Sequence, residues 1–280
     1  MVDAYRPKNL KDALEAIIYT EHIVFAGGTD LMVKKKQWAS LMPAFDKPVL
    51  FIADLDELKQ ITVAEGYLTI GAACTFSSLI DSPLIPTSYK QVFMQIASPA
   101  VRNIATLGGN ICNSSPAGDS LPLLYALDAT IIIENSCRKI EIPIADFIIG
   151  PGRNRLNSSE LVTAIKLPVL DFDKAVYKKV SARRSTALSK VSFVAMAKLG
   201  DNKLDDIRIA FGSVAPTVVR SRDVEEAIIY NCSNGSFDKT EIISYYATLI
   251  KPIDDQRSTA FYRRTVCKRL LVDLMDNWLC

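Results

Sequence analysis

The chain has 280 residues, of which 49% are hydrophobic and 23% charged, and its formal net charge at pH 7 is +2. This length and composition fit a globular protein with a sizeable core, and the near balance of charge argues against a nucleic-acid-binding surface or an acidic tail. No apolar run approaches the roughly 18 residues that a membrane span requires, so we expect no membrane span.

The six cysteines are scattered singly along the chain. No two of them have the C-x-x-C spacing that zinc sites and iron–sulfur clusters use. The N-terminal segment MVDAYRPKNLKDALEA has no apolar core behind a basic start, so we expect no signal peptide. Single cysteines without an export signal favour a reducing compartment. The sequence therefore predicts a cytoplasmic protein with no metal site of its own.

The first part of the chain mixes short helices and strands. Apolar residues recur at helical spacing after Pro7 and predict the first helix, from Leu10 to Ile18. Thr29 and Asp30 are residues that can cap the start of a later helix. The other predicted elements here are a strand over 23–26, a helix over 31–36 and a strand over 48–55.

From about residue 57 the pattern changes to one of hairpins and short helices. The alternation over 58–72 predicts a β-hairpin that turns at Glu65-Gly66. The further predicted elements are helices over 75–80, 88–98 and 120–127 and strands over 129–134, 137–144 and 160–168. Helices and antiparallel strands mixed in this way indicate the α+β class.

The segment LPVLDFD, residues 167–173, reads as a linker to a C-terminal domain. This domain is expected to have a three-stranded antiparallel sheet and three helices, with the last two strands joined around Gly200-Asp201-Asn202. The predicted strands cover 174–182, 190–199 and 204–214, and the predicted helices cover 223–230, 240–250 and 260–279. The predicted domains are 1–56, 57–170 and 171–280.

Several common catalytic and nucleotide-binding patterns are absent from the sequence. His22 is the one histidine, which gives poor support to a serine–histidine triad or a histidine-ligated metal. No G-x-x-x-x-G-K-[ST] segment occurs, and GPGRNR at 150–155 lacks the third glycine of a dinucleotide-binding turn. A Rossmann-type site and a P-loop are therefore not supported.

Two glycine pairs remain as candidates for a ligand site, Gly27-Gly28 in VFAGGTDL and Gly108-Gly109 in TLGGNICNSSPAGDS. Each pair can expose successive backbone N–H groups as an anion-binding nest, and two facing nests would suit a pyrophosphate. The alternative, two ordinary tight turns, stays open. Asp119 could accept hydrogen bonds from a ribose or ribityl hydroxyl, cap the helix predicted over 120–127, or do both.

Three long segments carry a resemblance: AGGTDL at 26–31, RNIATLGGNICNSSPAGDS at 102–120 and YKKVSARRSTALSKV at 177–191. Together they resemble the FAD-binding medium subunit of the xanthine dehydrogenase family of molybdenum hydroxylases, which includes aerobic carbon monoxide dehydrogenase and nicotinate dehydrogenase. The resemblance covers essentially the whole chain. It implies a two-part FAD-binding module of the vanillyl-alcohol-oxidase (PCMH) type, followed by a C-terminal domain like that of the carbon monoxide dehydrogenase flavoprotein.

The resemblance also implies which residues bind FAD. It implies one pyrophosphate loop of Val24, Phe25, Ala26, Gly27, Gly28, Thr29, Asp30 and Leu31 and a second of Thr106, Leu107, Gly108, Gly109 and Asn110. By the same resemblance Asp119 is an acidic ligand, and Ile96, Leu156 and Lys179 contact the flavin or lie near its ring. Ile96 stands where the animal enzymes have an aromatic residue and cannot stack as a ring would, so the shielding of the flavin stays open.

The implied function is that of an electron-transfer subunit with non-covalently bound FAD. Electrons would start at a molybdenum cofactor on a large partner subunit and pass to [2Fe–2S] clusters on a small one. From these clusters they would reach the FAD of this chain and then pass to NAD⁺ or another acceptor. Two alternatives stay open: a self-sufficient flavin oxidase or reductase of the same fold, and a non-catalytic assembly subunit. A co-purifying molybdenum subunit would argue against the first, and bound flavin against the second.

Overall fold

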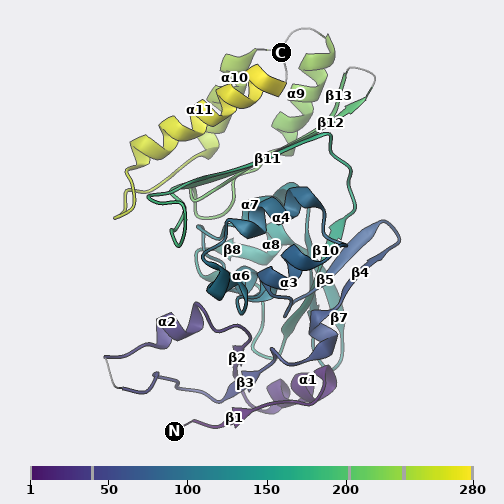
Figure 1. Cartoon of the computed structure of the whole chain (residues 1–280), viewed down its shortest axis with the longest axis vertical. Coiled ribbons are helices and arrows are strands. Elements are labelled where there is room, and N and C mark those ends of the chain that lie inside the picture. The colour runs from purple at the N-terminus through teal and green to yellow at the C-terminus, as the bar shows by residue number, and fades with distance from the viewer. Residues whose placement is uncertain (1, 39–40, 201–202, 235–237, 279–280) are drawn as a thin grey trace. The chain divides into compact units, whose positions relative to one another are not determined.

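The computed structural model describes residues 2–38, 41–200, 203–234 and 238–278 (Figure 1). The chain forms two compact units. Unit 1 contains residues Met1–Pro86, Ala97–Ser114 and Ala129–Pro168, and unit 2 contains Thr87–Ile96, Ser115–Asp128 and Val169–Cys280. Two short segments from the middle of the chain, 87–96 and 115–128, therefore belong with the C-terminal part.

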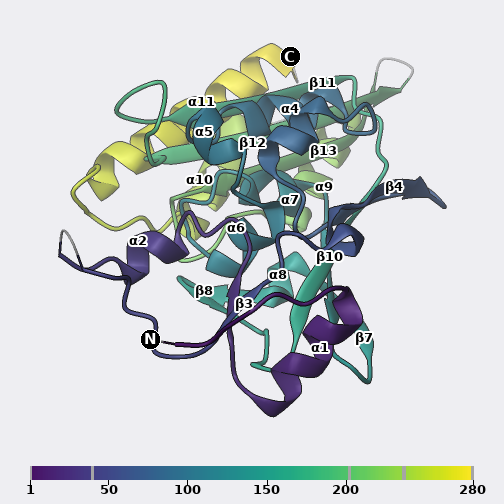
Figure 2. The same ribbon diagram turned by 60° about the horizontal axis from the view of Figure 1, so that its bottom comes forward.

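Unit 1 begins with a three-stranded parallel sheet in the order β1-β3-β2. The elements of this part are β1 (Ala4–Tyr5), α1 (Leu10–Tyr19), β2 (Ile23–Phe25), α2 (Leu31–Lys35) and β3 (Val49–Phe51). Both predicted helices and both predicted strands are confirmed. The strand predicted over 48–55 is shorter, because the chain turns into a 3₁₀ helix, η1 (Asp56–Lys59). The apolar face of α1 packs on β3 through Ala13, Leu14 and Ile17 (Figures 1 and 2).

The larger sheet of unit 1 is antiparallel, with the strand order β4-β5-β10-β6-β7. Its strands are β4 (Ile61–Ala64), β5 (Tyr67–Gly71), β6 (Thr130–Glu134), β7 (Lys139–Pro143) and β10 (Leu161–Pro168). The predicted hairpin is confirmed, with Glu65 and Gly66 both at positive φ in its turn, as a two-residue hairpin loop requires. Shorter elements complete the unit: α3 (Phe76–Asp81), α5 (Pro99–Arg102), α6 (Leu107–Asn113), α8 (Ile144–Phe147), β8 (Ile148–Gly150) and β9 (Arg153–Asn154).

Unit 2 is built on the antiparallel sheet β11-β12-β13, with α9, α10 and α11 together on one side of it (Figure 1). The elements are α4 (Thr87–Met94), α7 (Leu121–Ala126), β11 (Lys174–Val180), β12 (Val191–Gly200), β13 (Lys203–Gly212), α9 (Arg222–Asn234), α10 (Lys239–Leu249) and α11 (Ala260–Trp278). The predicted three strands and three helices are confirmed. Asp201 and Asn202 of the predicted turn lie outside the described residues, as does Leu279 at the end of the last predicted helix.

Two helices from the middle of the chain, α4 and α7, complete unit 2 on the other face of its sheet (Figure 1). Residues 191–197 of β12 are all buried, so both faces of the central strand are covered. The helix predicted over 88–98 ends earlier than expected, at Met94, because Ala97 has φ +46° and Ser98 starts a new helix before Pro99. Pro99 disfavours helical backbone at the residue before it, Ser98, so the helix cannot continue to residue 98.

An ion-pair network fixes the carboxyl end of α7 inside unit 2. Arg208 donates from Nη1 to the Ala126 carbonyl (2.9 Å), and Arg220 donates to the Tyr125 carbonyl and to Asp128. Glu225, a buried residue of α9, accepts from Arg220 Nε (3.0 Å). Arg208 thus supplies a donor to a terminal helix carbonyl, and Arg220 adds a second donor to the Tyr125 carbonyl, which also accepts from the Asp128 N–H (3.1 Å).

A buried carboxylate of unit 1 leads to a prediction about acid stability. Glu160 accepts hydrogen bonds from Arg138 Nη2 (3.0 Å) and from the backbone N–H of Asn157 (3.1 Å). Burial alone would raise the pKa of Glu160, but these donors together outweigh burial and hold the pKa below its usual 4.5. The unfolded chain therefore binds the proton more readily, and the free energy of unfolding falls as the pH drops below about 4.5.

We expect Glu160→Gln to lose less unfolding free energy than the parent between pH 6 and pH 3, because the titrating group is gone. Urea unfolding at a series of pH values measures this slope. The exposed helix residue Glu15 provides the control, since Glu15→Gln removes a carboxylate that has one partner at 3.8 Å. An unchanged slope in Glu160→Gln would show that Glu160 does not carry the acid sensitivity.

Candidate functional site

The first glycine pair forms an open turn between β2 and α2. Gly28 has φ +69°, a conformation that favours glycine, and its carbonyl accepts from the Met32 N–H (2.8 Å). The backbone N–H groups of Gly27, Gly28 and Thr29 find no acceptor within the part of the chain that the structure describes. Asp30 is the N-cap of α2 but makes no capping hydrogen bond with its side chain. The turn therefore presents unsatisfied donors of the kind that bind an anion.

This turn lies directly against the segment that leads into the second glycine pair. A Cβ atom built on Gly27 would lie 1.9 Å from the carbonyl oxygen of Ile104 and 3.0 Å from Cα of Ala105. Only glycine permits so close an approach between two backbones. Because Ala105 immediately precedes Thr106, the two glycine-bearing segments are neighbours in unit 1.

The second glycine pair is not a loop, and the prediction of a second N–H nest there is wrong. Gly108 and Gly109 lie in the first turn of α6, where the Gly108 N–H donates to the Ala72 carbonyl (3.0 Å). The Gly109 N–H donates to Oγ1 of Thr106 (3.1 Å), which is the N-cap. These donors serve helix capping and packing, so this segment offers the N-terminal end of a short helix instead of free N–H groups.

The two glycines of α6 have different surroundings. A Cβ on Gly108 would meet the backbone oxygen and Cβ of Ala72 at 2.7 Å, so Gly108 is required for packing. A Cβ on Gly109 would meet only Oγ1 of Thr106, at 2.8 Å, and Gly109 is exposed. Gly109 is therefore the glycine whose missing side chain leaves surface open at the start of α6.

Leu156 is held close to the other end of α6. Its N–H donates to Oδ1 of Asn154 (3.1 Å), and Nδ2 of Asn154 donates to the Cys112 carbonyl (2.9 Å). The Gly152 N–H donates to the Ser114 carbonyl (2.9 Å). The structure thus gathers three of the predicted groups in unit 1: residues 24–31, residues 106–110 and Leu156.

Cys112 is placed in α6 as a structural residue. Burial raises the pKa of its thiol to about 12, so the nucleophilic thiolate is scarce at neutral pH. Within residues 2–38, 41–200, 203–234 and 238–278, no group of three or more His, Cys, Asp or Glu side chains could hold a metal ion. No helix among those residues is long and apolar enough to cross a membrane.

The remaining predicted residues meet in unit 2 around a buried ion pair. Nζ of Lys179 on β11 donates to Oδ2 of Asp119 (2.6 Å), and the two side chains are only 5% and 10% exposed. Lys179 also donates to the carbonyl of Gln95 (3.0 Å), the residue before Ile96. Ile96 itself is 7% exposed. Three residues distant in sequence, Ile96, Asp119 and Lys179, are therefore brought to one place.

The structure argues against one of the two predicted roles of Asp119, that of helix cap, and the role as a ligand of FAD stays a prediction. Ser120 is the N-cap of α7, so the helix-capping role of Asp119 is wrong. Its second oxygen, Oδ1, accepts from the Ser189 hydroxyl (2.5 Å). Both oxygens of a buried carboxylate thus have a charged or polar donor, as a carboxylate in this position requires.

Two residues of this cluster were missed by sequence reasoning. Tyr177 is buried, and its hydroxyl faces the Asp119 carboxylate. Burial and the nearby Asp119 carboxylate raise the pKa of Tyr177 well above 10. The two-residue period of a strand places Tyr177 on the same face of β11 as Lys179, and this was a usable signal. Ser189, in an irregular segment, carried no comparable signal.

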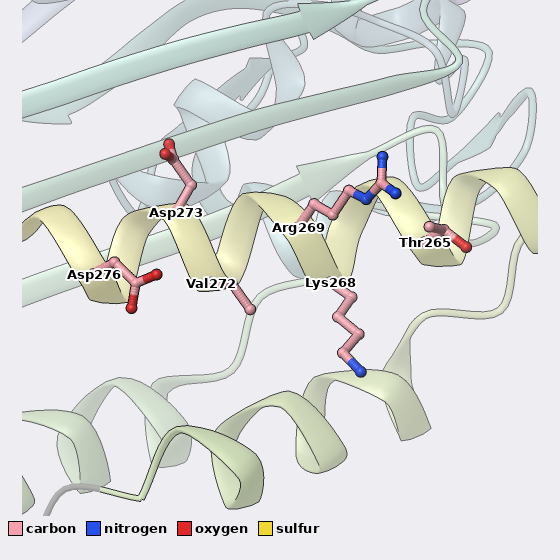
Figure 3. Close-up of a pocket in the computed structure, with 6 residues that line it drawn as sticks. All are labelled: Thr265, Lys268, Arg269, Val272, Asp273 and Asp276. Carbon is pink, nitrogen blue, oxygen red and sulfur yellow. The ribbon is translucent and has the colours of Figure 1, made fainter.

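The surface of α11 carries a shallow hollow (Figure 3). Its lining residues all belong to this one helix: Thr265, Lys268, Arg269, Val272, Asp273 and Asp276. In Figure 3 Arg269 and Asp273 point to one side of the helix and Lys268 to the other, and Asp276 pairs with Lys239 (2.6 Å). Because these side chains do not converge, the hollow offers no binding arrangement comparable to the clusters above.

Comparison with protein-family models gives two matches that together cover most of the chain. Residues 1–170 match the FAD binding domain in molybdopterin dehydrogenase, and residues 175–277 match the CO dehydrogenase flavoprotein C-terminal domain. The first match covers more than half of the 280 residues, which is sufficient to assign a family.

Individual proteins agree with these matches. The chain is 31% identical to the glyceraldehyde dehydrogenase medium chain of Sulfolobus acidocaldarius, over 95% of this chain and 94% of that protein. It is 31% identical to the nicotinate dehydrogenase FAD-subunit of Eubacterium barkeri, over 70% of this chain and 69% of that one. A solved chain of the carbon monoxide dehydrogenase from Hydrogenophaga pseudoflava has the same fold, with a TM-score of 0.84 at 22% identity over 98% of this chain and 96% of that chain.

Proposed function

The chain belongs to the family of FAD-binding subunits of molybdenum hydroxylases, and from this premise we propose that it carries electrons through FAD within such a complex. The observation that carries the proposal is the Gly27–Thr29 turn. Its N–H groups lack acceptors in the described residues, and it lies against the backbone that leads into α6. Unsatisfied N–H donors beside a helix N-terminus are suited to a pyrophosphate.

The residues of unit 1 fit the phosphate part of FAD. In this proposal the turn over 24–31 donates its free N–H groups to the pyrophosphate, while residues 106–110 supply the positive end of α6. The exposed surface at Gly109 leaves room for the phosphates. Leu156, held beside α6 by Asn154, supplies an apolar contact to the flavin.

The residues of unit 2 fit the ribityl chain and the ring. Asp119 accepts from a ribityl or ribose hydroxyl through lone pairs that Lys179 and Ser189 leave unused. Lys179 places a positive charge near the ring, and Ile96 packs on the ring by apolar contact without aromatic stacking. When bound, FAD supplies the two-electron redox chemistry, so the chain itself needs no general base.

The proposal includes partner subunits. A molybdenum cofactor on a large subunit would pass electrons to [2Fe–2S] clusters on a small subunit, and these clusters would pass them to FAD. From FAD the electrons would go to NAD⁺ or another acceptor. Relatives named as a medium chain and as an FAD-subunit support a heteromeric complex. We also retain as proposals the domain limits 1–56, 57–170 and 171–280, the non-covalent binding of FAD, and a cytoplasmic location.

The visible absorption spectrum of the purified chain, followed by anaerobic titration with NADH, tests this function. We expect a flavin spectrum that bleaches as NADH reduces the bound FAD. A flavin that stays oxidised with NADH but is reduced when the partner subunits are present would retain the FAD role and exclude direct exchange with NAD⁺. Absence of flavin even after FAD is added would overturn the proposal and favour an assembly subunit.

Affinity purification from the native source separates the remaining alternative. We expect the molybdenum and [2Fe–2S] subunits to co-purify with the chain in fixed ratio. A chain that purifies alone with FAD and turns over a substrate of its own would instead be a self-sufficient oxidase or reductase.

A further inference from the structure

Ser189 occupies an unusual position for a polar residue in an irregular segment. It is 0% exposed, and its hydroxyl donates to Oδ1 of Asp119 at 2.5 Å. The opposite oxygen, Oδ2, is held by Lys179 at 2.6 Å. Two donors, one on each oxygen, fix the plane in which the carboxylate of Asp119 lies.

A further layer of contacts holds Ser189 in place. Arg257 donates from Nη1 to the Ser189 carbonyl (3.3 Å), and its guanidinium is itself fixed by Asp255 through Nε (3.0 Å) and Nη2 (2.6 Å). Oδ1 of Asp255 accepts from Arg263 Nη2 (2.6 Å). Arg263 is 2% exposed and also donates to the Ser213 carbonyl (2.9 Å), so this layer is anchored in the core beneath α11.

The charge state of Asp255 is consistent with this anchoring role. Its burial raises its pKa, but hydrogen bonds from Arg257 and Arg263 outweigh the burial and hold the pKa well below the usual value of 3.8. Asp255 is therefore ionised at neutral pH, and it keeps both arginines oriented.

We propose that Ser189 is a positioning residue for the bound flavin: its hydroxyl holds the Asp119 carboxylate in the orientation that accepts from FAD, and Arg257 holds Ser189. This inference rests on the proposed function, since it assumes that Asp119 contacts FAD. A carboxylate fixed by two donors loses little rotational freedom when a ligand hydroxyl binds, so the cost of ordering it is met during folding.

The test is the affinity of the flavin-free chain for FAD, measured by quenching of flavin fluorescence. We expect Ser189→Ala to bind FAD about tenfold more weakly, the order of effect of one hydrogen bond to a charged group. The matched control is Ser192→Ala on β12. Ser192 is also 0% exposed, but within the described residues its hydroxyl has no partner, so its removal should leave FAD affinity unchanged.

A double-mutant cycle shows whether Ser189 acts through Asp119. We expect Asp119→Asn to weaken FAD binding, and we expect Ser189→Ala to cost less than about twofold more in that background. Arg257→Met, which removes the donor to the Ser189 carbonyl and leaves Asp119 intact, should weaken binding in the same direction.

The outcomes distinguish failure of FAD binding from failure of the role proposed for Ser189. If the parent chain binds no FAD, the proposed function fails. If the parent binds FAD and Ser189→Ala binds it equally well while the flavin-free variant unfolds more easily, Ser189 is only structural and the inference is overturned. Additive effects in the cycle would likewise show that Ser189 does not act through Asp119.

Discussion

A chain carrying Gly109→Val is expected to fold and to contain no bound FAD. Gly109 is exposed at the start of α6, and a new Cβ there meets only the side-chain oxygen of Thr106. Valine would displace the Thr106 hydroxyl and weaken this helix cap, at a cost of about 1 kcal/mol that the fold can bear, and it would fill the space that the pyrophosphate is proposed to occupy. We expect FAD affinity to fall at least about 100-fold, or roughly 3 kcal/mol.

The measurement is the ratio of flavin to protein absorbance after purification in excess FAD, together with the far-ultraviolet circular dichroism of the variant. Gly108→Ala is the informative control, because its Cβ would meet the Ala72 backbone and should lower stability even without FAD. A folded Gly109→Val chain with full FAD occupancy would contradict the assignment of the phosphate site to the start of α6.

The largest expected loss of stability comes from Glu225→Ala. The Glu225 side chain is 1% exposed, and its oxygens accept from the Ile209 N–H (2.7 Å), Arg220 Nε (3.0 Å) and Arg222 Nη1 (3.1 Å). Alanine would leave the buried guanidinium of Arg220 with fewer acceptors and one core N–H without a partner. Breaking a buried pair by removing one member typically costs about 3–5 kcal/mol.

Equilibrium unfolding in urea, followed by fluorescence, measures this loss. Glu226→Ala, at the exposed neighbouring position on α9, is the control and should change the unfolding free energy by less than about 0.5 kcal/mol. Equal stabilities for the two variants would show that the network around Arg220 does not stabilise unit 2.

Much of the fold was predictable because its signals are local. The hairpin turn at Glu65-Gly66 follows from alternation and from residues that accept positive φ. The helix predicted over 88–98 ends early, and Pro99 was the local signal for this, since the residue before a proline avoids helical backbone. The inclusion of 87–96 and 115–128 in unit 2 could not be predicted, since covering the second face of β12 depends on which distant helices pack there.

The candidate site was likewise predictable only in part. The open turn at Gly27-Gly28 was predicted from a strand, two glycines and a helix start in immediate succession. The interpretation of Gly108-Gly109 as a nest was wrong, because whether an N–H is free depends on acceptors elsewhere, here the carbonyl of Ala72. Thr106, a good N-cap, was the local signal that a helix begins there.

The sequence by itself determined the family, through three long motifs, and the positions at which the backbone must turn. Those properties depend on each residue and its near neighbours. Only the tertiary structure decided which polar groups are paired and which are left for a ligand. Asp119 and Ser189 are 70 residues apart, and their hydrogen bond exists because α7 packs against β12, and these two residues lie just before α7 and β12. Burial makes each unpaired polar group costly, so the pairing pattern is set by the whole fold and not by any segment of the chain.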